Sequence, residues 1–397
     1  MWYNSIVSAN YVNKYRLFPT KAQMRQLDET LETCRLVYNS FVHWRTFEYE
    51  TAKKSVGRYE QEAALTHWKH KVSDGKKEHP ELSEVHAHLL QNVAHRVDLA
   101  FRAFFRRAKA GETPGYPRLK GKEQYDSFCF KQWENGVQFK NGNLWLSKIG
   151  KIKCKVHRPL LGEAKTCCLR RVNGKWFACI TCEVEPVLLP VSKERIGIDV
   201  GLKTFAALSD GTFIENPRFF RTQEKALAKA SRKQAKTKKR SRECRKANKV
   251  LARIHERIRN RRHNFAHQTA RRLVNQYGMI AVEKLAVKNI SKAPAPKPDA
   301  ENEGQYLPNG ASAKAGLNKS ILDAAWSQFR SILTNKAESA GREVVAVNPA
   351  YTSQKCSGCG YQASKSLKER WHLCPMCGTS LDRDTNAAIN ILAIAMG

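Results

Sequence analysis

The stretch Arg195-Ile-Gly-Ile-Asp-Val-Gly-Leu202 places one carboxylate inside a run of apolar residues and glycines. If it forms a strand, its period of two puts the isoleucine and valine side chains on one face and Asp199, with Gly197 and Gly201, on the other. A carboxylate in an apolar strand is costly unless it is paired or bound to a metal ion. Asp199 is therefore a candidate catalytic residue, and we expect the glycines to let a phosphate backbone approach. A local turn or salt bridge is the alternative.

Two further acidic residues stand at the ends of predicted elements. Glu283 follows the apolar strand candidate Met279-Ile-Ala-Val282, and Asp384 precedes a helical pattern, where Asp382 competes with it. Alone, either could be an exposed strand end or a helix cap. Together with Asp199 they give the layout of an RNase H-like nuclease, whose hydrolysis of a phosphodiester uses two divalent ions about 4 Å apart. Because Mg²⁺ prefers oxygen ligands, we expect two Mg²⁺ ions at these carboxylates.

A second metal pattern lies near the end of the sequence. Cys356-Ser-Gly-Cys359 and Cys374-Pro-Met-Cys377 are separated by fourteen residues, which is typical of a structural Zn²⁺ site built on two turns. Free thiols or a redox pair are the alternatives. Cys179-Ile-Thr-Cys182 has the same local spacing, but in a predicted strand these positions point to opposite faces. We interpret that pair as packing, like Cys167 and Cys168, because twelve cysteines in 397 residues are too sparse for a disulfide scaffold.

The charge of the chain indicates a polyanionic partner. It has 70 Lys+Arg against 36 Asp+Glu, a net charge of +34 that would repel itself unless neutralised. Between Arg221 and Arg262 lie 18 Lys/Arg and three Glu, too one-sided for an ordinary solvated helix, so nucleic acid is favoured over a membrane surface. The segment Met1–Val7 lacks the features of a signal peptide, and no run approaches the roughly 18 apolar residues of a spanning helix. We expect a soluble, cytoplasmic protein.

The N-terminal part predicts a short strand followed by helices. Asn13 to Phe18 is the strand candidate, and Thr20 with Gln23 has the spacing of a capping box. Apolar residues from Met24 to Trp44 recur at steps of three and four, so one helical face is apolar. A second helical pattern runs from about Ser83 to Ala110 and gains arginines near its end. These patterns indicate a small basic helical unit.

Turn residues mark the next boundaries. After residues 111–117 the pattern changes to strands, and Asn141-Gly142 and Asn173-Gly174 each lie between two strand candidates. Asn-Gly supplies the positive φ angles of a type I′ hairpin turn, so we expect a small β-barrel or curled sheet. After Pro190, three short strands up to Ile214 begin an α/β domain.

The later part of the α/β domain is interrupted by a loop. The stretch from Lys292 to Gly316 is rich in Pro, Gly and Ala, which predicts a mobile loop. One helix from about Lys319 to Ala340 is predicted next, and Val344–Val347 is a further strand candidate. The expected core face of the helix consists of Ile321, Ala325, Phe329, Ile332 and Leu333.

Ordered motifs over nearly the whole chain resemble the TnpB family of transposon-encoded RNA-guided DNA nucleases. Its three RuvC motifs and zinc ribbon are similar to Gly197-Ile-Asp-Val-Gly-Leu202, Val282-Glu-Lys-Leu285, Asp382-Arg-Asp-Thr-Asn-Ala-Ala-Ile-Asn-Ile391 and Thr352-Ser-Gln-Lys-Cys-Ser-Gly-Cys-Gly360. Other signatures are similar to Tyr15–Thr20, Arg35–Asn39, Gly115–Lys120 and Asn318–Trp326. The resemblance implies that the catalytic carboxylates are Asp199, Glu283 and Asp384, with Asp384 favoured over Asp382. It implies that the Zn²⁺ ligands are Cys356, Cys359, Cys374 and Cys377.

The resemblance also implies a multidomain α+β fold. An RNase H-like (RuvC) α/β nuclease core would carry an inserted zinc ribbon, beside a β-barrel wedge domain and a helical recognition domain. The implied boundaries are 1–19 and 113–190 for the wedge, 20–112 for the recognition domain, 191–349 for the nuclease domain with basic helices 221–277 and flexible loop 292–318, 350–380 for the ribbon, and 381–397 for the third motif and last helix.

The implied function is RNA-guided cutting of DNA beside a short adjacent motif. The partners would be a guide RNA, of the omega RNA or crRNA-like kind, and a target duplex with its displaced strand. No membrane partner is expected, and a monomer is favoured. The alternatives are a compact type V CRISPR effector with the same chemistry, a guided regulator that does not cut, and a strand-transfer transposase. Intact carboxylates argue against the regulator, and the ribbon between the second and third acidic motifs disfavours the transposase.

Overall fold

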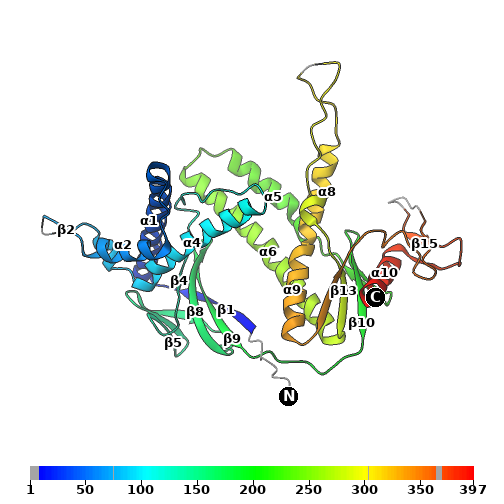
Figure 1. Ribbon diagram of the computed structural model, residues 1–397, viewed down its shortest axis with the longest axis horizontal. Helices are drawn as coiled ribbons and strands as arrows, with labels where there is room; N and C mark the ends of the chain where they lie inside the picture. Colours follow the sequence, from blue (N-terminus) through cyan, green and yellow to red (C-terminus); the bar gives the residue numbers. More distant parts are fainter. Residues whose placement is uncertain (1–8, 75, 303, 364–368) are drawn as a thin grey trace. The chain divides into compact units, whose positions relative to one another are not determined.

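The computed structural model describes residues 9–74, 76–302, 304–363 and 369–397. It divides into two compact units, Met1–Glu185 and Pro186–Gly397 (Figure 1). The segment Met1–Val7, for which we expected no signal peptide, lies outside the described residues. Within the described ranges, no helix is both long and apolar enough to cross a membrane.

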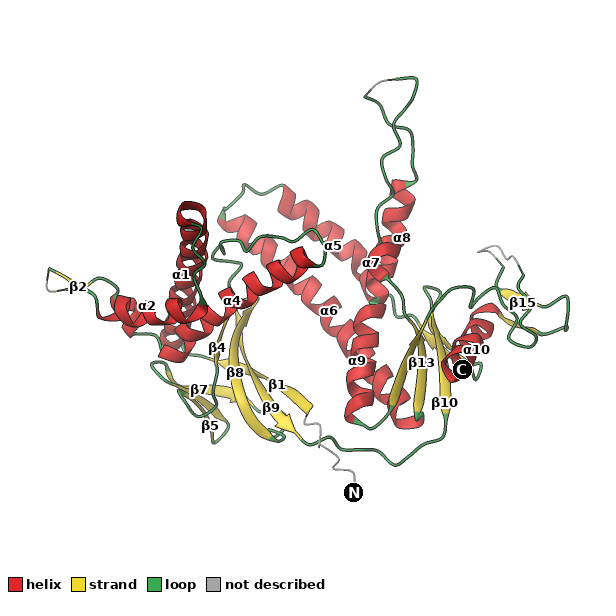
Figure 2. Ribbon diagram, viewed as in Figure 1, coloured by secondary structure: helices red, strands yellow, loops and turns green. Residues whose placement is uncertain are grey.

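The first unit is built on a seven-stranded antiparallel sheet with the order β4-β8-β9-β1-β7-β6-β5. Its strands are β1 (Ala9–Phe18), β4 (Ser127–Phe130), β5 (Val137–Lys140), β6 (Asn143–Leu146), β7 (Gly150–Lys155), β8 (Glu163–Val172) and β9 (Lys175–Val184). Because β1 pairs with β9 and β7, the first strand of the described residues lies in the middle of the sheet. The sheet is curved (Figure 2), but β4 and β5 do not pair in the described part, so these strands form the curled sheet rather than a closed barrel.

Both predicted Asn-Gly turns are confirmed. Asn141 and Gly142, with φ of 47° and 69°, join β5 to β6, and Asn173 and Gly174, with φ of 51° and 72°, join β8 to β9. Positive φ at both turn residues matches the twist of the two strands. The turn thereby fixes the register in which every second residue of Trp176–Cys182 faces the core.

The cysteines of this sheet have two different roles. Cys182 is buried and Cys179 is half-buried on the opposite face, as predicted for packing, and Cys167 is also buried. The prediction was wrong for Cys168, which forms a disulfide with Cys129. The two residues face each other in the register of β4 and β8, although they are 39 positions apart in sequence. Cysteine spacing alone could not reveal this pairing because it depends on which strands become neighbours.

The two helices predicted for the first unit form, with shifted ends, and two further helices and a short strand pair that were not predicted lie between them. The helices are α1 (Lys21–Ala52), α2 (Arg58–His70), α3 (Pro80–Ser83) and α4 (Ala87–Lys109), with β2 (Val72–Ser73) and β3 (Lys76–Lys77) between α2 and α3. The capping box is present, since the Gln23 N–H donates to the Thr20 hydroxyl at 3.2 Å and the Thr20 N–H donates to the Gln23 side chain at 3.1 Å. The second predicted helix begins at Ala87, after His86 accepts a bond from the His88 N–H.

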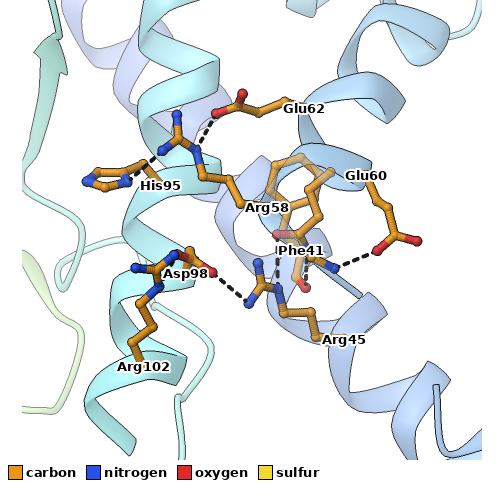
Figure 3. A network of polar contacts seen from close by, with 10 residues as sticks. Phe41, Arg45, Arg58, Glu60, Glu62, His95, Asp98 and Arg102 are labelled. Carbon is orange, nitrogen blue, oxygen red and sulfur yellow. Dashed lines mark hydrogen bonds and ion pairs between the residues drawn. The ribbon is translucent and has the colours of Figure 1, made fainter. Parts of the chain in front are cut away.

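A polar network ties three of these helices together (Figure 3). The buried guanidinium of Arg45 on α1 donates to the Gln61 side chain at 3.1 Å and lies 3.5 Å from the Asp98 carboxylate on α4. Asp98 also pairs with Arg102 at 2.7 Å, and Gln61 donates to the Phe41 carbonyl at 3.0 Å. The side chains of Arg45, Gln61 and Asp98 therefore each have a partner on another helix, which fixes how α1, α2 and α4 pack.

The second unit contains a five-stranded sheet with the order β12-β11-β10-β13-β14. Its strands are β10 (Arg195–Val200), β11 (Thr204–Leu208), β12 (Phe213–Glu215), β13 (Met279–Glu283) and β14 (Glu343–Val347). β10, β13 and β14 are parallel, whereas β11 and β12 are antiparallel.

Helices cover both faces of this sheet (Figure 2). Ile280 and Val282 pack towards α6 (Arg242–Gln276) and α9 (Trp326–Ser339), and Ala281 packs towards α10 (Arg383–Met396). Because both faces are covered, β13 is apolar throughout until Glu283, as expected of a buried parallel strand. The other helices are α5 (Phe219–Ala235), α7 (Val287–Ile290) and α8 (Ala311–Ala324).

Two predictions about the segment before β14 were wrong. α8 begins at Ala311, inside the loop predicted for residues 292–318. The single helix predicted from Lys319 to Ala340 is two helices, because Ala325 has a left-handed backbone with φ of 53° and separates α8 from α9. Alanine is the best helix former, so nothing in the local sequence marks this break. The predicted core residues Ile321, Phe329 and Leu333 are nevertheless buried.

Candidate active site

Three carboxylates gather at one edge of the five-stranded sheet. Asp199 lies near the end of β10 and Glu283 is the last residue of β13. The two strands are parallel and pair Ile198 with Val282, so the acidic residues that follow emerge at the same edge and on the same face. Asp384 lies in the first turn of α10, which covers that face. Residues far apart in sequence are thereby brought together.

Gly197 explains how α10 comes so close to β10. A Cβ atom at this position would lie 2.0 Å from the Ala388 carbonyl oxygen and 2.9 Å from the Leu392 Cβ, so no larger residue fits. We expected the glycines to admit a phosphate backbone, and for Gly197 this was wrong because α10 occupies that space. Asp199 points to the same face as Gly197, and the close approach of α10 brings Asp384 towards it.

The three carboxylates repel one another. Burial raises the pKa of Asp199 well above its ordinary value, and the charges of Glu283 and Asp384 raise it further, with Arg383 acting in the opposite direction. Burial also raises the pKa of Glu283, against the effect of a hydrogen bond of 2.9 Å that the Thr352 hydroxyl donates to it. A bound cation would relieve the repulsion between half-buried groups of like charge such as these.

Asp382 and Asp384 have different surroundings. Asp382 is the N-cap of α10, and one of its carboxylate oxygens accepts from the N–H groups of Asp384 at 2.8 Å and Thr385 at 3.2 Å. Burial and the Asp382 charge raise the pKa of Asp384, whereas Arg370, 3.5 Å away, and Lys203 are among the cations that lower it. The carboxylate of Asp382 thus caps α10, and the charge of Asp384 raises the pKa of Asp199 more than the charge of Asp382 does.

The chemistry of this donor set fits divalent cations with oxygen ligands. Carboxylates are the ligands that Mg²⁺ prefers in proteins. Among the described residues, only the cysteine cluster below brings three or more potential ligand atoms within 4.8 Å of one another, so the carboxylates are more widely spread. A wider arrangement suits two ions about 4 Å apart better than one tightly chelated ion.

Four cysteines form a second candidate metal site. The Sγ atoms of Cys356, Cys359, Cys374 and Cys377 all lie within 4.8 Å of one another. The pairs Cys356–Cys377 and Cys359–Cys374 are each 3.6 Å apart, close to the edge of about 3.8 Å of a tetrahedron with 2.3 Å Zn–S bonds. Two tight turns shape the cluster, in which the Gly360 and Gly378 N–H groups donate to the carbonyls of Cys356 and Cys374. The four sulfur atoms can hold one Zn²⁺ ion.

Polar side chains attach this cluster to α10. The strands β15 (Trp371–Leu373) and β16 (Ser380–Asp382) lead from the cysteines into the helix. Asn386 accepts from the Ser357 N–H at 2.9 Å and donates to the Lys355 carbonyl at 2.7 Å, and Asn390 donates to the Thr352 carbonyl at 2.8 Å.

Sequence reasoning assigned no role to these asparagines or to Thr352. Asn386 and Asn390 stand four positions apart in a helix, where Asn is a poor helix former. Two asparagines on the same face of a helix are unusual, and this spacing could have indicated that their side chains bind another segment. Thr352, which links the cysteine segment to Glu283, carries no local signal.

Three protein-family models match the chain. A model described as a probable transposase, of the OrfB (IS605) type, matches residues 179–293, a Cas12f1-like TNB domain matches 326–391, and an OrfB-type helix-turn-helix domain matches 12–54. The first two matches include the three carboxylates and the four cysteines. Within 12–54 the structure has β1 and the single helix α1, rather than two helices joined by a turn.

Two relatives align with almost the whole chain. An RNA-guided DNA endonuclease of Streptomyces pristinaespiralis is 34% identical over 389 residues, which are 96% of this chain and 89% of the relative. RNA-guided DNA endonuclease InsQ of Escherichia coli K12 is 31% identical over 387 residues, 96% of this chain and 91% of InsQ. Among solved structures, the cryo-EM structure of a Cas12f1–sgRNA–target DNA complex aligns with a TM-score of 0.58 and 13% identity, covering 97% of this chain and 98% of that one. At this identity the similarity concerns the fold alone.

Proposed function

This chain belongs to the TnpB family of OrfB-type RNA-guided DNA endonucleases, and on that premise we propose that Asp199, Glu283 and Asp384 form its cutting site. One observation carries the proposal: three separate elements bring carboxylates to one sheet edge, where burial and mutual repulsion raise the pKa of Asp199. Structural carboxylates are usually paired with cations or donors, so repelling ones held together are typical of functional sites. The reaction is hydrolysis of a DNA phosphodiester at a place selected by a bound RNA.

The metal ions of this site would be two Mg²⁺. When bound, they would activate the attacking water and stabilise the leaving oxygen. The residues of the chain fix the ligands in place. The Thr352 hydroxyl restrains one oxygen of Glu283, and Asp382 caps α10 and so orients its first turn, which carries Asp384. Glycine at 197 allows that turn to approach Asp199.

We assign the domains in the same way. The five-stranded sheet with α10 is proposed as a RuvC-type nuclease core, which its three parallel strands and antiparallel edge pair support. Residues 350–380 are proposed as a zinc ribbon, supported by the four clustered sulfur atoms and the TNB-domain match. The helical segment 20–112 is proposed as the recognition domain, and the curled sheet of 1–19 and 113–190 as the wedge.

The partners are a guide RNA and its target DNA. Between Arg221 and Arg262, 18 basic residues stand against three Glu, mostly on α5 and α6, and this excess supports contact with a nucleic-acid backbone. The relatives at 31–34% identity and the OrfB-type match favour a transposon-encoded nuclease over a CRISPR effector. No observation favours a guided regulator that does not cut.

The test of the function uses the protein with its own RNA. The chain is purified from its native host, the bound RNA is sequenced, and duplex DNA matching the guide segment is added with Mg²⁺. We expect cutting of the matched DNA, none of a duplex with a scrambled target, and none when a chelator replaces Mg²⁺. Cutting that is equal for matched and scrambled DNA would contradict guidance, and cutting in the chelator would contradict the metal assignment.

The Zn²⁺ assignment is tested separately. Metal analysis of the purified protein should find about one Zn²⁺ per chain. Cys374→Ser removes a buried ligand and should abolish that content, whereas Cys244→Ser, a buried cysteine outside the cluster, should leave it unchanged. Wild-type protein without Zn²⁺ would disprove the assignment.

A further inference from the structure

We propose that a basic pocket beside the acidic site binds a phosphate group of the DNA strand that is cut, and so positions the next phosphodiester at the carboxylates. The pocket is a cavity of about 520 Å³ in the second unit. Its lining includes Lys203, Asn216, Arg218, Arg221, Ser320 and Asp323. The proposal rests on the proposed function and adds a binding site to it.

The pocket lies next to the end of β10. Lys203 belongs to the turn that follows β10 and precedes β11, four positions after Asp199. The charge of Lys203 also reaches Asp384. In a sheet of this kind, ligands bind outside the carboxyl ends of the parallel strands. A strand whose scissile phosphate lies at the carboxylates must carry its neighbouring phosphates along the same edge, towards this pocket.

The charges of the pocket are unbalanced. Its one acid, Asp323, pairs with Arg262 at 2.8 Å and accepts from the Phe220 N–H at 2.8 Å. Arg221 pairs with Glu224 at 2.9 Å. Within the described part of the chain, neither Lys203 nor Arg218 forms an ion pair with a carboxylate. Two cations that form no ion pair in a hollow are suited to an anion, and a phosphate diester is the anion that the substrate supplies.

The backbone of Arg218 is held in an unusual conformation. Its φ of 44° and ψ of 52° lie in the left-handed region, which is disfavoured for Arg. Asn216 fixes this geometry, because its side chain accepts from the Arg218 N–H at 3.2 Å and donates to the Leu202 carbonyl at 2.9 Å. The Arg218 guanidinium in turn donates to the Lys203 carbonyl at 3.4 Å.

These hydrogen bonds clamp the turn after β10 against the start of α5. They place Lys203 and Arg218 side by side in the pocket lining. A strained residue that its surroundings hold in place is typical of a site that needs a fixed geometry.

The test removes charge from the DNA in one set of experiments and from the protein in another. Single methylphosphonate linkages, which are neutral, are introduced one at a time around the cut site of guide-matched DNA, and cutting rates are measured with the RNA-loaded protein. The main variant is Arg218→Asn, because Asn tolerates the left-handed backbone and the loss then reports the guanidinium. Arg218→Lys keeps the charge. Arg195→Gln is the matched control, because Arg195 is an exposed cation at the opposite end of β10.

For wild-type protein we expect one linkage near the cut whose neutralisation slows cutting by about 10-fold or more. Arg218→Asn should slow cutting of unmodified DNA by a similar factor, and neutralising the same linkage should then have no further effect. Arg218→Lys should recover part of the rate, Arg195→Gln should behave as wild type, and binding of guide-matched DNA should be unchanged in all three variants.

Two results separate this inference from the proposed function. The first result is that Asp199→Ala is inactive but Arg218→Asn either cuts at the wild-type rate or keeps the wild-type sensitivity to every methylphosphonate. In that case the pocket does not bind the phosphate, and only this inference fails. If Asp199→Ala still cuts, the proposed cutting site itself is wrong.

Discussion

Buried charge is arranged in opposite ways in the Arg45 network of the first unit and in the acidic site of the second. In the first unit, Arg45 lies between a glutamine amide and the Asp98 carboxylate, so each polar group meets a partner of opposite charge or a hydrogen-bonding group (Figure 3). In the acidic site, Asp199 and its acidic neighbours Glu283, Asp384 and Asp382 share one sign, and each neighbour raises the pKa of Asp199 beyond what burial does.

The difference separates a structural role from a functional one. A paired buried charge fixes how helices pack, and its loss leaves the partner without compensation. Carboxylates that repel each other destabilise the fold, so their presence together indicates a ligand that the fold must hold. The two regions should therefore respond in opposite ways to the removal of one acid, and four measurements examine this contrast, from the largest expected effect to the smallest.

Asp199→Ala should reduce guided DNA cutting by about 10⁴-fold, or about 5 kcal/mol of transition-state stabilisation, because the site would lose one of the carboxylates proposed to hold the metal ions. The measurement is the single-turnover cutting rate of the RNA-loaded protein in Mg²⁺. RNA binding and thermal stability should not fall. Asp210→Ala, which alters an exposed acid beyond β11, is the control and should cut as wild type.

Asp98→Ala should lower the free energy of unfolding by about 3 kcal/mol, because it leaves the Arg45 guanidinium buried without its carboxylate partner. Denaturant unfolding of the full chain measures the change. The double variant Arg45→Met with Asp98→Leu should recover most of the loss, since it removes both charges together. If the double variant loses as much unfolding free energy as Asp98→Ala, the network stabilises the fold through packing rather than through charge pairing.

Asp199→Asn should stabilise the metal-free protein by about 1–2 kcal/mol at neutral pH, because it removes the repulsion. The folded pKa of Asp199 is raised, so the wild-type protein loses stability as pH rises from the ordinary value of about 4 through the raised value. The advantage of the variant should vanish below about pH 4. Thermal unfolding across pH, without Mg²⁺, measures it, and an advantage that is independent of pH would argue against repulsion.

Thr352→Val should raise the Mg²⁺ concentration for half-maximal cutting by about 10-fold. The substitution removes the hydrogen bond that lowers the pKa of Glu283 and restrains its carboxylate, while keeping the side-chain shape. Thr51→Val, which removes a hydroxyl bonded to a helix carbonyl in the first unit, is the control. An unchanged Mg²⁺ requirement would mean that Thr352 does not position Glu283.

The sequence determined the features that neighbouring residues decide. Periodicity identified the strand around Asp199, and two Asn-Gly pairs identified hairpin turns. The Thr20–Gln23 capping box marked the start of α1, and the cysteine spacing identified four cysteines whose sulfur atoms cluster. Each of these features depends on contacts between residues close in sequence, or, for the cysteines, on two tight turns. Local sequence is therefore enough to predict it.

Only the tertiary structure decided the features that depend on which elements become neighbours. Gly197 is small because α10 lies against it, Cys168 pairs with Cys129 through a strand register, and Ala325 breaks a helix that its own sequence would continue. Asp382 and Asp384 are the same residue type, two positions apart. They differ because Asp382 ends β16 and caps α10, whereas Asp384 has the larger effect on the pKa of Asp199. Contacts between segments far apart in sequence determine these features, and hydrophobic periodicity does not predict such contacts.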